Sequence, residues 1–161
     1  YAARGLTRDD VFLFAFDEGT SCAGVYTRSH TSSADVLWCR EALRAGGGKA
    51  RALIANSGNS NAFTGPKGVL KNEATLKALT ETLDVPREAC FLAATGVIGE
   101  PMPDDLLRSS LPELAGAVGA ASPEAWAVSA DAIRTTDTFA KGSARRVDGG
   151  VSHVVGIAKG N

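Results

Sequence analysis

The sequence is poor in the features that mark several large classes of protein. Its net charge is −1 over 161 residues, which argues against a nucleic-acid partner or a polybasic membrane surface. No apolar run approaches the roughly 20 residues that a membrane-spanning helix needs. Hydrophobic residues make up 44% of the chain and charged residues 22%, a composition typical of a soluble globular protein. The length suits one domain, which we expect over residues 1–161.

Cysteine and histidine are also scarce. The three cysteines, Cys22, Cys39 and Cys90, lie far apart in apolar surroundings, whereas disulfide scaffolds use more cysteines and usually an even number. We therefore expect buried free thiols and a reducing cytoplasm, with a catalytic or metal-binding role as the weaker alternative. The two histidines do not pair with the cysteines at zinc spacing, so we expect no metal site.

Familiar catalytic motifs are absent as well. The sequence holds neither G-x-x-x-x-G-K-[ST] nor G-x-G-x-x-G, which bind phosphate groups. It also lacks G-x-S-x-G and H-E-x-x-H, which mark two kinds of hydrolase. Serine, histidine and aspartate form no motif that indicates a triad. If the protein is an enzyme, we expect its nucleophile to lie outside this chain.

Strand-like and helix-like segments alternate, which predicts an α/β or α+β fold with helices covering a sheet. Strands are expected at residues 11–16, 22–27, 51–57, 90–99 and 151–161. A helix capped by Asp35 is expected, and further helices are expected to begin at or near Gly68, Pro103 and Ser122. We expect the first strand, an unbroken apolar run, to be buried on both faces and to form a hairpin with the second.

Three polar segments each follow the end of a strand or helix: ANSGNSNAFTG (55–65), AATGVIG (93–99) and RTTDTFAKG (134–142). Glycine lets a backbone approach a ligand closely, and consecutive N–H groups in a turn attract negative charge. Thr95 and Gly96 are therefore candidates for an oxyanion site. From the residues alone, a plain glycine turn is the commoner interpretation of this segment.

These motifs occur together, in this order, in one family. The sequence resembles the N-terminal portion, the α chain, of the glutamate N-acetyltransferases of the ornithine acetyltransferase (ArgJ) family. ANSGNSNAFTG resembles the family's N-S-G-x-A-N-A-x-T-G, and TGVIGEPMP resembles its T-G-[VL]-I-G-x-x-[LM]-P. AIRTTDT resembles its A-I-M-T-T-D, and GIAKGN its G-x-A-K-G-x-G. The resemblance runs from about Asp10 to Asn161, nearly the whole chain.

The resemblance implies an αββα-like sandwich of the ArgJ/DmpA type, completed by a separate β chain cut from the same precursor, in an (αβ)2 heterotetramer. It implies a cytoplasmic acyltransferase of arginine biosynthesis. The N-terminal threonine of the β chain takes acetyl from N-acetyl-L-ornithine and gives it to L-glutamate. The cycle uses no metal or cofactor, although some bifunctional members also accept acetyl-CoA as the acetyl donor. The sequence ends inside the motif that precedes the family's cleavage site, so we expect the precursor to continue beyond Asn161.

The resemblance also implies roles for four residues. Thr95 and Gly96 match the family's oxyanion pair, and we expect a bulky residue in place of Gly96 to reduce turnover far more than folding. Thr135 matches a substrate-binding threonine. Lys159 matches a substrate-binding lysine, whose charge would hold a carboxylate or lower the pKa of the nucleophile's amine. From the residues alone, Thr135 is a helix terminator and Lys159 a solvated lysine.

The asparagines of the first polar segment have a supporting role in this interpretation. Asn56, Asn59 and Asn61 are expected to bond neighbouring backbone and to hold the oxyanion pair in place. The sequence departs from the family pattern at Ser60 and Phe63. Two alternatives stay open: a related self-processing, aminopeptidase-like hydrolase that uses water in place of glutamate, and a non-catalytic α/β module that binds small anions in its glycine loops.

Overall fold

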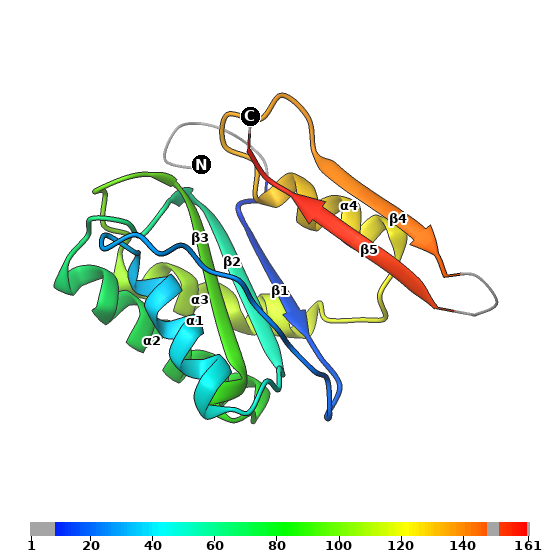
Figure 1. The fold of residues 1–161 in the computed structure, drawn as a ribbon, viewed down its shortest axis with the longest axis horizontal. Coiled ribbons are helices and arrows are strands. Elements are labelled where there is room, and N and C mark those ends of the chain that lie inside the picture. The colour runs from blue at the N-terminus through cyan, green and yellow to red at the C-terminus, as the bar shows by residue number, and fades with distance from the viewer. Residues whose placement is uncertain (1–8, 148–151, 161) are drawn as a thin grey trace.

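The computed structural model of the chain describes residues 9–147 and 152–160 (Figure 1). The helices and strands follow in the order β1 (Val11–Ala15), α1 (Ala34–Ala45), β2 (Ala52–Asn59), α2 (Pro66–Leu83), the short 3-10 helix η2 (Arg87–Ala89), β3 (Cys90–Val97), α3 (Asp104–Gly116), α4 (Pro123–Ala132), β4 (Lys141–Arg146) and β5 (His153–Ala158). The predicted mixture of helices and sheet is confirmed. Over the described ranges, no helix combines the length and the apolar character needed to cross a membrane.

The main sheet has three strands, with β2 between β1 and β3. β1 runs antiparallel to β2, and β3 runs parallel to it. Because β2 and β3 run the same way, the polar residues at their carboxyl ends lie side by side. Thr95 faces Ser57, and Gly96 faces Gly58. The first two polar segments of the sequence therefore meet at one edge of this sheet.

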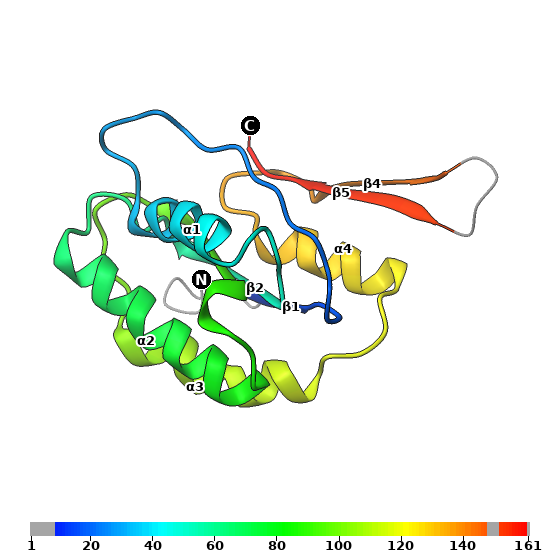
Figure 2. The same cartoon turned by 60° about the horizontal axis from the view of Figure 1, so that its bottom comes forward.

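Helices cover both faces of this sheet, as Figure 2 shows. Successive side chains of a strand point to opposite faces, so Leu53 and Phe91 pack against α1, while Ile54 and Leu92 pack against α2 and α3. α4 lies on the same side as α1, where the ring of Trp126 contacts that of Phe14 in β1, with 4.9 Å between centroids. The larger core cluster contains Ala52, Ile54, Leu76, Ala78, Leu79, Val85, Cys90, Leu92, Leu107 and Leu111.

A second, two-stranded sheet is formed by β4 and β5, which run antiparallel. This hairpin extends away from the main sheet, with α4 beneath it (Figures 1 and 2). The expected last strand is confirmed as β5, although Val151 and Asn161 lie outside the described residues. β4 is absent from the predicted strands, because its sequence KGSARR lacks an apolar pattern and nearly all of it is exposed.

Three local predictions are wrong. Residues 22–27 form no strand, because β1 takes β2 as its partner instead. β1 is an edge strand whose residues are half-buried or exposed, not a strand buried on both faces. The N-cap of α1 is Ser33, whose hydroxyl accepts a hydrogen bond from the Val36 amide at 3.4 Å. Asp35 lies in the first turn of α1 and is buried, where it serves a polar network described below.

The cysteines largely follow the prediction. All three are free thiols, with Cys39 and Cys90 buried and Cys22 partly exposed. Burial raises the pKa of both Cys39 and Cys90 to about 11. The thiol of Cys39 also donates a hydrogen bond to the Leu92 carbonyl at 3.2 Å. Cys39 and Cys90 therefore belong to the packed interior, as expected for structural thiols.

Candidate functional site

Thr95 and Gly96 lie near the end of β3, where the backbones of β2 and β3 come unusually close. Gly96 has a φ of +135°, which side chains of L-residues rarely adopt. A Cβ atom at this position would lie 2.4 Å from the carbonyl carbon of Gly58 and 2.8 Å from the amide nitrogen of Asn59. Only glycine fits this approach. Thr95 and Gly96 are both half-exposed, so a ligand can reach them.

The loops that follow β2 and β3 are bonded to each other. The amide and the hydroxyl of Ser60 both donate to the Val97 carbonyl, at 3.0 and 3.1 Å. The amide of Gly99 donates to the Ala62 carbonyl at 2.8 Å. These bonds continue the pairing of β2 with β3 beyond the strands. The segment that carries Thr95 is therefore fixed against ANSGNSNAFTG on both sides of the close approach.

The three asparagines of the first polar segment are buried and bond nearby backbone, as predicted. The side-chain amide of Asn56 donates to the Asn59 carbonyl at 3.2 Å, and that of Asn61 donates to the Gly68 carbonyl at 3.3 Å. The side-chain amide of Asn59 donates to the Glu100 carbonyl. Since the Asn59 backbone is one of the groups that exclude a side chain from position 96, these bonds support the geometry of the glycine approach.

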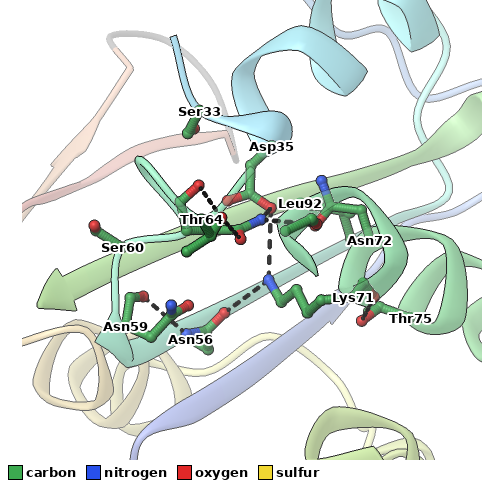
Figure 3. Close-up of polar contacts among 12 residues, drawn as sticks. Ser33, Asp35, Asn56, Asn59, Ser60, Thr64, Lys71, Asn72, Thr75 and Leu92 are labelled. Carbon is green, nitrogen blue, oxygen red and sulfur yellow. Dashed lines mark hydrogen bonds and ion pairs between the residues drawn. The ribbon is translucent and has the colours of Figure 1, made fainter. Parts of the chain in front are cut away.

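A buried ion pair, Lys71 with Asp35, lies beside Asn56 (Figure 3). Lys71 on α2 is 2% exposed and Asp35 on α1 is 3% exposed. The Lys71 ammonium lies 3.5 Å from the Asp35 carboxylate and donates to the side-chain oxygen of Asn56 at 3.2 Å. The side-chain amide of Asn61 donates to the same carboxylate oxygen at 3.2 Å. Burial lowers the pKa of Lys71, and the charge of Asp35 opposes that change.

This network was not predicted from the sequence. Lys71 precedes Thr75 and Leu79 by one and two helical turns, so it lies on the buried side of α2. That spacing was the available signal, because a lysine on an apolar helix face needs a buried partner. Through Asn56, the Lys71–Asp35 pair connects α1 and α2 to the carboxyl end of β2.

Asp137 links Thr135 to Gly160, the residue that follows Lys159. The Thr135 amide donates to Asp137 Oδ2 at 3.4 Å. Asp137 Oδ1 accepts from the Gly160 amide at 3.0 Å and from the Lys141 ammonium at 2.6 Å. The hydrogen bonds from Lys141 and Gly160 hold the pKa of Asp137 well below its usual range. Lys159 itself is exposed and Thr135 is half-buried.

The structure thus gathers the four predicted residues into two groups, Thr95 with Gly96 and Thr135 with Lys159. The carboxyl ends of β2, β3 and β5 point in the same direction (Figure 1), so both groups lie toward the same end of the molecule. Among the described residues, no group of three His, Cys, Asp or Glu side chains is arranged to hold a metal ion. The arrangement defines an α/β protein whose strand ends carry a close glycine approach and clustered polar loops.

Comparison with known proteins gives the family. Residues 2–161 match the ArgJ family, and the chain belongs to it. The chain is 44% identical over 156 residues to the arginine biosynthesis bifunctional protein ArgJ of Gluconobacter oxydans. The matched region covers 96% of this chain and 36% of that relative. A second ArgJ protein, from Ruegeria pomeroyi, is 45% identical over 156 residues, with 96% of this chain and 38% of the relative covered. The chain therefore spans a little over a third of the length of these relatives.

Two solved structures share the fold. One is the structure of ornithine acetyltransferase from Mycobacterium tuberculosis, complexed with ornithine. It superposes on this chain with a TM-score of 0.86 at 31% identity, and the superposed region covers 94% of this chain and 80% of that one. The arginine biosynthesis bifunctional protein argJ of Bacillus halodurans gives a TM-score of 0.79 at 30% identity, with 94% and 78% covered. The predicted fold of the ArgJ type is confirmed.

Proposed function

We propose that this chain is one part of an acyltransferase that moves an acetyl group from N-acetyl-L-ornithine to L-glutamate. The observation that carries the proposal is the close approach of Gly96 to the β2 backbone beside a half-exposed Thr95, in a chain of the ArgJ family. In the proposal, the Thr95 hydroxyl and the Gly96 amide stabilise the oxyanion of the tetrahedral intermediate. Thr135 and Lys159 bind the substrate, with the lysine ammonium facing a carboxylate.

The nucleophile in this proposal is the N-terminal threonine of a second chain from the same precursor. Its free α-amine, with a pKa of about 8, takes the hydroxyl proton as the oxygen attacks the acetyl carbonyl. The C–N bond of the intermediate then breaks, and the proton passes to the departing ornithine amine. The glutamate amine attacks the acetyl-threonine, and its proton returns through the α-amine to restore the threonine hydroxyl. This cycle needs no metal or coenzyme, and acetyl-CoA is an alternative donor in a bifunctional enzyme.

A groove on this chain favours such a partner. α4 and the β4–β5 hairpin enclose a space of about 780 Å³. Much of its lining is small or apolar, including Pro123, Trp126, Ala130, Ala144, Val155 and Ile157. Nearby, Val154 is 63% exposed. Since the relatives are much longer than this chain, we propose that the rest of the precursor covers this groove as the β chain. It would complete the sandwich around a single domain of residues 1–161, in a cytoplasmic (αβ)2 heterotetramer.

The test uses the full-length gene product. Intact-mass measurement should find two chains, one of which begins with threonine, and the purified protein should form N-acetylglutamate and ornithine in equal amounts. Acetate release that does not need glutamate would support the hydrolase instead. One uncut chain that binds small anions without turnover would support the non-catalytic module.

A variant tests the oxyanion assignment within this proposal. Thr95→Val keeps the branched shape of the side chain but removes its hydroxyl, and should lower kcat by roughly 10²- to 10³-fold. Thr80→Val is the matched control, because the Thr80 hydroxyl bonds the Lys77 carbonyl within α2, at 2.8 Å. The control should keep kcat near that of the wild type. Equal kcat values for the two variants would remove Thr95 from the oxyanion site.

A further inference from the structure

We infer that Asp137 and Lys141 form a clamp on Gly160 that fixes the position of Lys159 relative to Thr135. The inference rests on the proposed function, since it takes Thr135 and Lys159 as residues that contact substrate. Asp137 and Lys141 are positioning residues in this scheme, and neither is assigned a contact with the reacting atoms.

The clamp holds both polar groups of the Gly160 backbone. The Gly160 amide donates to the Asp137 carboxylate at 3.0 Å, and the Gly160 carbonyl accepts a hydrogen bond from the Lys141 ammonium. The same carboxylate and ammonium bond each other at 2.6 Å. Gly160 has a φ of +137°, so the clamped residue adopts a conformation that favours glycine. A backbone with both groups bonded to one ion pair has little freedom to move.

The position of Lys159 follows from this arrangement. The residue before it, Ala158, is the last residue of β5 and pairs with Lys141 in the hairpin. The residue after it, Gly160, is held by the clamp. Because its backbone is fixed on both sides, Lys159 loses freedom mainly in the main chain, while its exposed side chain stays available to a ligand. A fixed backbone lowers the amount of ordering that the lysine undergoes when it binds a carboxylate.

The second carboxylate oxygen of Asp137 fixes the other substrate-binding residue. The Thr135 amide donates to it at 3.4 Å, so one side chain ties the loop after α4 to the end of β5. The loop has further support from Arg134, whose guanidinium donates to the Thr138 carbonyl at 3.0 Å. The bond from Asp137 to Gly160 joins residues 23 positions apart. A local turn would explain the Thr135 bond but not the bond to Gly160.

Burial makes the clamp sensitive to substitution. The side chain of Asp137 is 2% exposed and that of Lys141 is 30% exposed. The carboxylate accepts three hydrogen bonds, two of them on one oxygen. Asparagine at this position has a single acceptor oxygen and an N–H₂ group. It therefore leaves at least one of the three donors facing another donor.

The experiment compares Asp137→Asn with wild type in the full processed enzyme. We expect KM for N-acetylornithine to rise roughly tenfold, with a smaller change in kcat, because the variant loses charge-assisted hydrogen bonds that order the binding residues. Hydrogen exchange should accelerate at the amides of Thr135 and Gly160. Lys141→Met should also raise KM, while Lys141→Arg, which keeps the charge, should restore most of the affinity. The control variant is Glu73→Gln, which removes the negative charge from the ion pair of Glu73 with Arg87. Its KM should stay near the wild-type value.

Each outcome bears on a separate claim. A lower Tm with an unchanged KM would make Asp137 a merely structural residue and overturn the inference. Unchanged exchange at Gly160 in Asp137→Asn would overturn the clamp itself. If the wild-type enzyme transfers no acetyl from N-acetylornithine, the proposed function fails, and the exchange measurement still decides whether the clamp exists.

Discussion

Replacing Gly96 by alanine would put a methyl group where the backbone of β2 already lies. Two separate penalties follow from the structure. A non-glycine residue at a φ of +135° is strained, which costs about 1–3 kcal/mol. The methyl carbon would also lie 2.4 Å from the Gly58 carbonyl carbon, and forcing such a group into packed structure costs a further 1–3 kcal/mol or so. Together, roughly 2–6 kcal/mol is a large part of the 5–15 kcal/mol that stabilises a typical domain.

The structure therefore changes one expectation from the sequence. Gly96→Ala should reduce folding as well as turnover, because the glycine serves the pairing of β2 with β3. Gly19→Ala separates the two penalties. Gly19 has a φ of +86°, and a Cβ there would meet no atom within 4 Å. This control should show the conformational penalty without the collision.

The assay is urea unfolding of both variants, followed by kcat per folded molecule. We expect Gly96→Ala to lose more stability than Gly19→Ala and to lose roughly 10²- to 10³-fold in kcat. Gly19→Ala should keep its kcat. Equal stability losses would show that the β2 backbone yields easily to a methyl group at position 96. A Gly96→Ala enzyme with normal kcat per folded molecule would refute the oxyanion assignment.

Three further predictions follow from buried groups. Lys71→Met should lower the free energy of unfolding, measured in urea, by about 3–5 kcal/mol, because Asp35 stays buried without its cation. Adding Asp35→Asn to this variant should restore much of the lost stability. A loss below about 1 kcal/mol for Lys71→Met alone would contradict the network. Asp137 has a lowered pKa, so its contribution to the free energy of unfolding is present above pH 3.8 and is lost as the pH falls through its folded-state pKa. As the pH is lowered, the free energy of unfolding should therefore fall less in Asp137→Asn than in the wild type. Parallel acid profiles of the two proteins would count against this. A thiol reagent at neutral pH should modify Cys22 first, since the other two cysteines are buried; mass mapping that finds the three labelled equally fast would contradict their placement.

Much of the fold was predictable from local sequence. The apolar runs and the glycines or prolines that end them placed β2, β3 and α2–α4 within a few residues of their observed bounds. Ser122 was correctly expected at the start of α4, where its hydroxyl accepts from the Ala125 amide at 3.1 Å. These features depend on neighbours in the chain, so local rules apply to them.

The wrong predictions concern features that depend on residues far apart in the sequence. The segment 22–27 resembles a hairpin partner, but β1 pairs with β2, some 40 positions on. Asp35 resembles a helix cap, yet its partner is Lys71 on α2, 36 positions on in the sequence. The exposed strand β4 exists because β5 pairs with it.

Part of the candidate site was likewise predictable from the sequence, and part of it was not. Thr95 and Gly96 stood out in the sequence as small polar residues at a strand end, and the structure adds the backbone of Gly58 that makes glycine necessary. Thr135 and Lys159 were found through the family motifs. Their link through Asp137 depends on a bond to Gly160, which a single sequence does not reveal.

The most direct test of the proposed function is to trap the acetylated enzyme. The full processed protein is mixed with N-acetylornithine that carries a labelled acetyl group, quenched in acid and analysed by tandem mass spectrometry. We predict one acetyl group on the N-terminal threonine of the second chain, which disappears when glutamate is added before the quench. An acetyl group on a residue of the chain described here, or no acetyl-enzyme while N-acetylglutamate accumulates, would contradict the account.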